Sequence, residues 1–341
     1  MNRPSELTPR EAQQRFIDDR RLDSTDHTVQ SYHYRTKSFV EWCEERDVQS
    51  VADLNGWLLD EYKRSLQGEN KPVTVKGKMT ALKQLLDYLA RIDAVDEALP
   101  DKVDIPTIER SEETSDVKLA TEDAERLLAF YREDAAWRGR TRHVVLELLW
   151  NTGCRLGGLR ALDVTDYHSD EEYVEFVHRP QTDTPLKNKD QGERAVSLPS
   201  TVCDVLDHYL ARERPDKRDE HGRDPLIGCR QGRPAAGTIR AWSYLATEPC
   251  ITIECPHGRS RPRCEYTERT HASKCPSSRS PHQVRTGSIT WHRDRGVPLE
   301  VTAERVNASP KVIERFYDKA SSVEKMENRR REYLENLDFE S

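Results

Sequence analysis

Apolar and polar residues alternate with helical spacing along most of this chain. In the first hundred residues, apolar side chains recur every three or four positions, which is the spacing of one buried helix face. The clearest run is Met79, Leu82, Leu85, Leu86 and Leu89. We therefore predict a small all-helical domain over residues 1–99. Basic residues are interleaved with these positions, and a solvated helix face explains them without a ligand.

The pattern changes beyond this region. Residues 100–115 are polar, contain two prolines and have no clear period, so we predict an interdomain linker over residues 100–118. Helical spacing then returns from Thr121, and two short alternating runs at residues 173–178 and 193–199 predict paired strands around a polar hairpin tip.

These elements predict a fold that is mainly α with a small antiparallel β-sheet, in the α+β class. We expect two domains, because 341 residues are enough for two separate cores. The second domain is predicted over residues 119–317, followed by a charged helical tail over residues 318–341. The apolar points of that tail are Val323, Met326, Tyr333, Leu334 and Leu337.

Composition indicates a protein that works in water. No apolar run approaches the ~18 residues of a membrane span, and the first ten residues have no signal-like apolar core. Charged residues make up 34% of the chain and hydrophobic residues 35%, so the surface is heavily ionised. We expect a cytoplasmic protein without a membrane partner.

The charge is unevenly distributed. The formal net charge is −7, which at first argues against nucleic acid, because DNA affinity depends on Lys and Arg that neutralise phosphates. From Ile251 to Arg295, however, nine Lys and Arg stand against four Asp and Glu, so this segment carries +5 and the remainder −12. A basic face on an acidic body is compatible with DNA binding, and the acidic remainder is similar to proteins of salty cytoplasm.

The end of the second domain holds the candidate chemistry. His282 and Arg285 are one helical turn apart, so on a helix they project from one face and can reach the same anion. Ser309 followed by Pro310 is typical of an N-cap and a first helical position, so a new helix should begin there and carry Tyr317 about two turns in. An arginine, a histidine and a tyrosine at one site suit phosphoryl transfer without a metal.

Four motifs follow one another in the second domain. They are TGCRLGGL at residues 152–159, the lysine-bearing hairpin that ends in ERAVSLP, HQVR at residues 282–285 and SPKVIERFY at residues 309–317. With these motifs the chain resembles the tyrosine recombinases, the family of phage-type integrases and Xer recombinases, and most closely their archaeal branch. The resemblance implies a core-binding domain that clamps DNA, followed by a catalytic domain.

The resemblance also implies a role for each matching residue. Tyr317 would attack the scissile phosphodiester, leaving a 3′-phosphotyrosyl bond and a free 5′-hydroxyl. Arg155 and Arg285 would hold the non-bridging oxygens, since a guanidinium fork binds phosphate through two donors and stays charged. The bond energy stays in the covalent intermediate, so neither a nucleotide nor a catalytic metal is expected.

The resemblance also implies that a lysine and a histidine transfer protons. Lys187 would protonate the departing 5′-oxygen, and Lys189 is the alternative because the hairpin is longer than in many relatives. His282 would assist the tyrosine or the phosphate by proton transfer or by a hydrogen bond.

The chain departs from the family pattern at several positions. Gly158 stands where an acidic residue is usual, Asn307 replaces His or Trp, and Thr286 replaces a second His. Asn307 can still donate a hydrogen bond to a phosphate oxygen, but it supplies neither a cation nor apolar surface. We expect weaker support for catalysis. A DNA-binding protein that keeps the fold without the chemistry is therefore the alternative, and a relaxing topoisomerase of related mechanism is a third hypothesis.

Each of these residues also has a simpler explanation when taken alone. An arginine after a helix usually forms a surface salt bridge worth ~0–1 kcal/mol, a tyrosine at helical spacing usually packs in a core, and lysine is common on polar turns. Only the joint order of the motifs favours recombination.

The expected partners are double-stranded DNA and further copies of the chain. In the family, the tail after the tyrosine often docks on a neighbouring protomer, which would connect cleavage to a homo-oligomer, a tetramer on two synapsed duplexes. A helix that packs on its own domain explains the same tail, and the sequence leaves both open.

The cysteines give a second, separate signal. Four of the eight fall within a short loop, at Cys250, Cys255, Cys264 and Cys275. Without a secretory segment a disulfide framework is not expected, whereas four soft ligands in a Gly/Pro/Arg-rich loop suit a tetrahedral structural zinc. We therefore predict a zinc-binding insertion over residues 250–275, with His257 or His271 as a replacement ligand. The spacing lacks a C-x2-C pair, so free thiols are the alternative.

Overall fold

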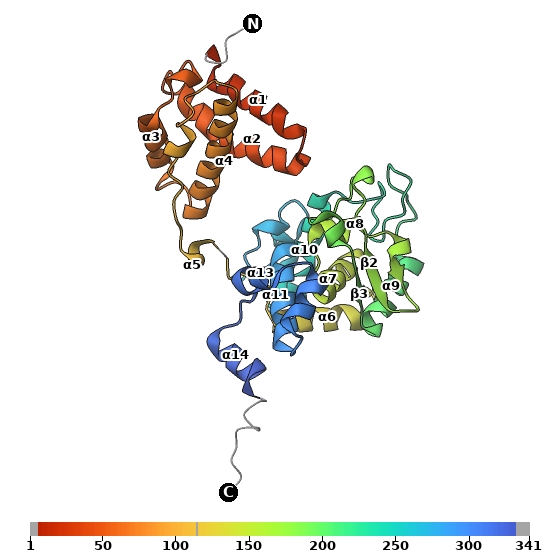
Figure 1. Ribbon diagram of the computed structural model, residues 1–341. Coiled ribbons are helices and arrows are strands. Elements are labelled where there is room, and N and C mark those ends of the chain that lie inside the picture. Colours follow the sequence, from red (N-terminus) through yellow and green to blue (C-terminus); the bar gives the residue numbers. More distant parts are fainter. Residues whose placement is uncertain (1–5, 114, 332–341) are drawn as a thin grey trace. The chain divides into compact units, whose positions relative to one another are not determined.

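The fold comes from a computed structural model that describes residues 6–113 and 115–331 (Figure 1). The chain forms two compact units, which divide at residues 115–116. Both are built mainly of helices, and the second also contains a small antiparallel sheet. The predicted α+β class is confirmed. Three apolar points of the predicted tail, Tyr333, Leu334 and Leu337, lie outside the described residues.

The first unit is a helical bundle. Its main helices are α1 (Pro9–Arg21), α2 (Asp26–Glu44), α3 (Gly56–Leu66) and α4 (Pro72–Arg91). Thr8 and Glu11 form a capping box that starts α1. The apolar run expected on one helix face lies on α4, where its five side chains are each at most 2% exposed.

Part of the predicted linker belongs to the core of this unit. The segment contains a short turn at Pro100–Lys102 and the helix α5 (Arg110–Glu113), and Val103 is buried against the bundle. Ile105 is partly buried against the same core, and two apolar residues are too few to show a period in the sequence.

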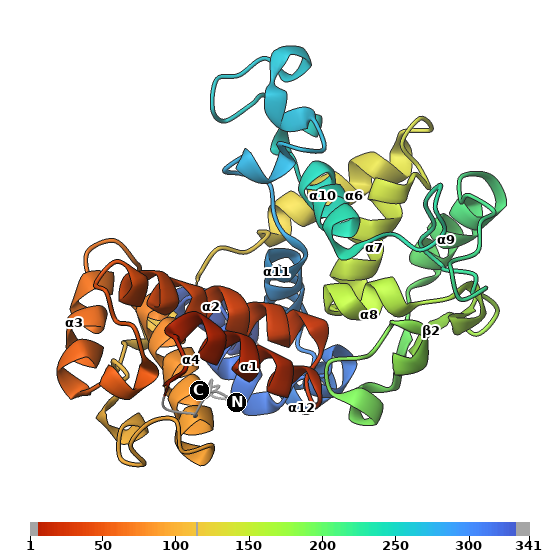
Figure 2. The same ribbon diagram turned by 90° about the horizontal axis from the view of Figure 1, so that it is seen from above.

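The second unit is organised around α7 (Thr141–Thr152), which is buried from His143 to its end. Its neighbours are α6 (Thr121–Glu133), α9 (Ser200–Arg212), α10 (Ala236–Ala246) and α11 (Pro281–Asp294), and Figure 2 shows α10 and α11 beside it. Each Leu or Val buried in this way contributes about 1.5–3 kcal/mol. α7 ends at Gly153 with φ 57°, where an added Cβ would lie 2.8 Å from Val306, so this position requires glycine.

The sheet has the order β1-β2-β3 and is antiparallel throughout. Its strands are β1 (Tyr167–His168), β2 (Tyr173–Phe176) and β3 (Arg194–Ser197). Val174 pairs with Val196, and Phe176 pairs with Arg194. The predicted strand pair is confirmed. β1 was not predicted, because two residues are too few to show an alternating pattern.

The remaining helices include those that follow Arg155 and those that lead to Tyr317. They are α8 (Leu156–Ala161), α12 (Leu299–Val306), α13 (Pro310–Val312), a π-helical turn (Ile313–Tyr317) and α14 (Ser322–Arg329). Ser309 accepts a hydrogen bond from the Val312 amide and caps α13, so the predicted helix start is confirmed. Among the described helices, none is both long and apolar enough to cross a lipid bilayer.

Candidate active site

Tyr317 lies at the end of the π-helical turn and is buried. Its side chain is 6% exposed and packs with Ile289, Val306 and Ile313. The Thr290 hydroxyl donates a hydrogen bond to the Tyr317 carbonyl at 3.1 Å. π-helical turns shift side chains out of α-helical register and are frequent at functional sites. This one brings the Tyr317 ring to α11.

Arg285 on α11 faces the Tyr317 ring and has no solvent exposure. Its guanidinium carbon lies 4.9 Å from the ring centroid. Its Nη1 donates to the carbonyl oxygens of Gly153 at 2.5 Å and Val306 at 2.7 Å, whereas Nε and Nη2 are buried without a hydrogen-bond partner. An uncompensated buried charge is costly, so these two nitrogens favour an anion beside Tyr317.

The pKa of Arg285 reflects the same environment. Burial lowers this pKa to about 10, with Tyr317 acting in the opposite direction and Arg155 in the same direction as burial. The side chain is therefore still charged at pH 7, because that pH lies well below the lowered value.

His282 lies one turn before Arg285, in a part of α11 that begins with Pro281 and a capping box between Ser280 and Gln283. Its ring centroid is 5.4 Å from that of Tyr317. His282 is exposed, and its pKa is lowered, first by partial loss of hydration and then by the charges of Arg285 and Arg155. The imidazole is therefore biased toward its neutral form, which can accept a proton.

Arg155 reaches this region from the N-terminus of α8. Its Nη1 donates to the Asn307 carbonyl at 2.7 Å. Asn307 ends α12 in a left-handed conformation, with φ 53°, which asparagine tolerates better than most residues. Two successive carbonyls, those of Val306 and Asn307, thus bind Arg285 and Arg155 in turn.

The Asn307 side chain contacts the loop between β2 and β3. Its Oδ1 accepts a hydrogen bond from Asn188 Nδ2 at 2.8 Å. Asn188 lies between Lys187 and Lys189, which are both exposed. Within the described ranges neither lysine side chain has an ion-pair or hydrogen-bond partner. The structure places the lysine loop beside Asn307 but does not bring either ammonium group to Tyr317.

One arginine near this site, Arg194, was not predicted from the sequence. Arg194 stacks on Phe176, with its guanidinium carbon 4.1 Å from the ring centroid, and its Nε donates to the Arg305 carbonyl at 2.8 Å. Burial lowers the pKa of Arg194 to about 10, and the charges of Arg285, Arg155 and Arg305 act in the same direction. The available signal was strand alternation, since Arg194 shares a strand face with the buried Val196.

The Phe176 ring also accounts for the glycine at position 158. A Cβ at Gly158 would lie 3.3 Å from Phe176, and Arg194 stacks on the same ring. A longer acidic side chain at this position therefore requires Phe176 to move.

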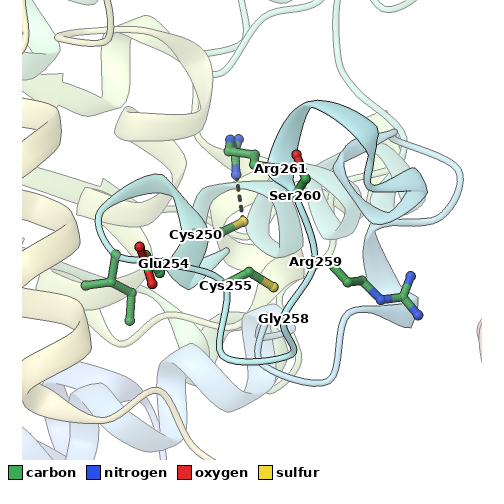
Figure 3. A pocket seen from close by; sticks show the side chains of 8 residues that line it. Cys250, Glu254, Cys255, Gly258, Arg259, Ser260 and Arg261 are labelled. Atoms are coloured by element: carbon green, nitrogen blue, oxygen red, sulfur yellow. Dashed lines mark hydrogen bonds between the residues drawn. The ribbon is translucent and has the colours of Figure 1, made fainter.

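The four loop cysteines line one small pocket together with His257, and His271 is not among its lining residues. Cys250 Sγ accepts a hydrogen bond from Arg261 Nη1 at 3.0 Å, with Cys255 nearby (Figure 3). As the side chains lie, no three His, Cys, Asp or Glu residues in the described ranges are grouped so that they could hold a metal. Zinc binding therefore stays a prediction.

Known proteins resemble this chain in sequence and in fold. No family model matches it. The tyrosine recombinase XerC 2 of Ralstonia nicotianae is 26% identical over 195 residues, which make up 55% of this chain and 53% of that protein. The chain thus spans about half the length of this curated relative.

Two solved structures share the fold over nearly the whole chain. The Tn1549 transposon integrase in complex with transposon right end DNA is 15% identical, with a TM-score of 0.62, and the match covers 96% of this chain and 99% of that one. The lambda integrase tetramer bound to a Holliday junction is 12% identical, with a TM-score of 0.61, and the match covers 93% of this chain and 79% of that one. The chain thus resembles a tyrosine recombinase in sequence and shares the fold of these two integrases.

The second unit carries the residues of all four motifs. Arg155, His282, Arg285 and Tyr317 come from three separate segments, since His282 and Arg285 both lie on α11. The described contacts connect these residues to one another and, through Asn307, to the lysine loop. Their individual roles remain predictions.

Proposed function

We propose that this chain is a site-specific recombinase that cleaves and rejoins duplex DNA through a 3′-phosphotyrosyl intermediate on Tyr317. The observation that carries the proposal is the state of Arg285, which has two buried nitrogens without partners next to the Tyr317 ring. A buried cation with free donors favours an anion. A phosphodiester is an anion that a tyrosine at this place can attack.

In the cleavage step, the Tyr317 oxygen forms a bond to phosphorus and the bond from phosphorus to the 5′-oxygen breaks. The phenolic proton passes to His282, whose lowered pKa favours the neutral base. Lys187, or Lys189 on the same loop, gives a proton to the departing 5′-oxygen. Arg155 and Arg285 neutralise the charge that develops on the non-bridging oxygens.

Rejoining is the reverse of this step with the same or a new 5′-hydroxyl as nucleophile. One phosphodiester replaces another, so the exchange consumes no nucleotide. The arginines supply the positive charge that stabilises the transition state, so no catalytic metal is part of the proposal.

The proposed partners are double-stranded DNA and other copies of this chain, as a tetramer on two synapsed duplexes in the cytoplasm. The solved structures of similar fold are a transposon integrase with DNA and an integrase tetramer on a Holliday junction. In α14, Val323 is 63% exposed and Met326 is 47% exposed, and apolar positions of this kind suit a neighbouring protomer. Serine at both positions should reduce tetramers on paired sites in analytical ultracentrifugation, while binding to a single site is unchanged.

The proposal is tested by trapping the intermediate. A nicked duplex that carries candidate sites from the genetic neighbourhood of the protein loses its short cleaved fragment, so the covalent adduct accumulates. Wild type should give a protein–DNA band on a denaturing gel, and Tyr317→Phe should give none. Tyr244→Phe on α10 is the matched control and should give as much adduct as wild type.

The alternative is a DNA-binding protein without strand cleavage, which the residues at Gly158 and Asn307 favour. Strong binding at a verified site with no adduct from wild type would support this alternative. A topoisomerase would differ from both, because it would relax supercoiled plasmids that contain no special site.

A further inference from the structure

The segment between α10 and α11 has almost no core of its own. Between residues 250 and 277, Ala272 is the one buried residue. Its regular structure consists of single turns, such as Arg261–Arg263, Glu265–Thr267 and Ala272–Lys274. Figure 2 shows the segment projecting from the second unit. So little apolar burial does not offset the entropy lost when a loop of this length is ordered, so another interaction is needed to hold it.

The cysteines of this loop converge on one place. Cys250, Cys255, Cys264 and Cys275 come from four different parts of the loop, and all four line the same pocket. His257 lines this pocket as well. Four thiols around one cavity in a loop without a core are the arrangement that a tetrahedral metal can crosslink.

We propose that Cys250, Cys255, Cys264 and Cys275 bind one structural Zn²⁺ ion that folds this loop. The thiols are not grouped for metal binding as they lie, so binding requires the loop to draw the four sulfur atoms together. His257 is the replacement ligand, because it lines the pocket while His271 does not.

Arginine side chains surround the pocket. Arg261 Nη1 donates to Cys250 Sγ at 3.0 Å, which is the kind of outer contact that orients and stabilises a metal-bound sulfur. The same guanidinium pairs with the buried Glu248 at 2.6 Å, which fixes its position. Arg259 also lines the pocket. These arginines offset the net negative charge of four thiolates around a divalent ion.

The metal would also fix the entrance to α11. Ser278 Oγ donates to the carbonyls of Ala272 and Cys275. The Arg279 amide then donates to Thr247 Oγ1 at 2.7 Å, and Ser280 caps α11. A crosslink at Cys275 therefore orders the chain just ahead of His282 and Arg285. This consequence for catalysis rests on the proposed function, whereas the metal site does not.

The metal content of the purified full-length chain tests the site directly. Mass spectrometry of metals should find about one zinc per chain, and a mercurial that blocks thiols should release it. Cys255→Ser and Cys264→Ser should each lower zinc at least about tenfold after desalting, since a lost ligand weakens a structural site strongly. Cys229→Ser, a partly exposed cysteine outside the loop, is the matched control and should retain its zinc.

Limited trypsin digestion gives a second readout that needs neither DNA nor activity. Arg259, Arg263 and Arg269 lie in the loop, and zinc should protect them from cleavage, whereas a strong chelator should expose them within minutes. Two results would overturn the proposal. One is a wild-type chain with negligible zinc and four freely alkylated loop thiols, and the other is a loop joined by disulfides under reducing purification. Either result leaves the proposed cleavage by Tyr317 untouched.

Discussion

At the residue scale, the unpaired nitrogens of Arg285 make the free protein responsive to anions. An anion that pairs with them stabilises the fold by linkage, by about 1.4 kcal/mol at ten times its Kd. We expect inorganic phosphate to raise the Tm of wild type in scanning fluorimetry, relative to chloride at equal ionic strength. Arg285→Lys should respond much less, because an ammonium lacks the planar fork. The exposed Arg240→Lys is the control, and equal shifts in all three proteins would contradict this account.

A second prediction at this scale concerns the hydrogen bond between Asn188 and Asn307. Asn307→Gly keeps the left-handed backbone, since glycine adopts positive φ freely, and removes only the amide. Asn188→Ala removes the other partner. If the bond positions the lysine loop, each single variant should cleave about tenfold more slowly than wild type. The double variant should then cleave at about the rate of the slower single variant. Single-turnover cleavage of the nicked duplex measures these rates. Multiplicative losses would show that the two residues act independently.

The lysine question also belongs to this scale. A bridging sulfur in place of the 5′-oxygen leaves without a proton, because a thiol is far more acidic than an alcohol. Lys187→Ala should therefore lose cleavage of the oxygen substrate and recover with the sulfur substrate, if Lys187 is the acid. If Lys189→Gly, rather than Lys187→Ala, recovers with the sulfur substrate, then Lys189 is the acid. Glycine is chosen at this position because Lys189 has φ 53°, which glycine adopts without strain.

At the scale of elements, the buried His292 on α11 should make the stability of the second unit depend on pH. Burial lowers the pKa of His292 to about 4, while an unfolded histidine titrates near ~6.5. The folded form therefore binds fewer protons than the unfolded chain. The free energy of unfolding is unaffected by His292 above the unfolded pKa and decreases as pH falls toward about 4. The loss amounts to about 3 kcal/mol. Urea unfolding at several pH values between neutral and acid measures the free energy of unfolding. This free energy should decrease less with falling pH in His292→Asn than in wild type. Equal decreases in the two proteins would contradict the role given to His292.

The elements also show what sequence pattern can predict. Capping chemistry is local, so Ser309 and Pro310 were sufficient to predict where the last helix of the site begins. The π-helical turn that follows was not predicted, because an inserted turn residue changes no capping signal and leaves the apolar spacing nearly intact. This turn sets the position of the Tyr317 ring, so the distance from tyrosine to arginine was not predictable from spacing.

At the scale of the whole molecule, apolar period and turn residues predicted a helical first part and an α+β second part. The site itself depends on contacts between residues far apart in sequence. Arg155 binds a carbonyl 152 residues away, and Asn188 binds a side chain 119 residues away. Such contacts have no local pattern. The sequence therefore predicted which residues would share the site but not that Asn307 connects the arginines to the lysine loop.

The most direct test of the central claim is to locate the covalent bond on the protein. The trapped adduct should be digested with trypsin and nuclease and then analysed by tandem mass spectrometry. Trypsin cuts after Arg315 and Lys319, which leaves the peptide of residues 316–319 with Tyr317 as its one tyrosine. We predict a nucleotide joined through its 3′-phosphate to Tyr317 in this peptide. A nucleotide on any other residue, or strand cleavage without a protein-bound nucleotide, would contradict the account.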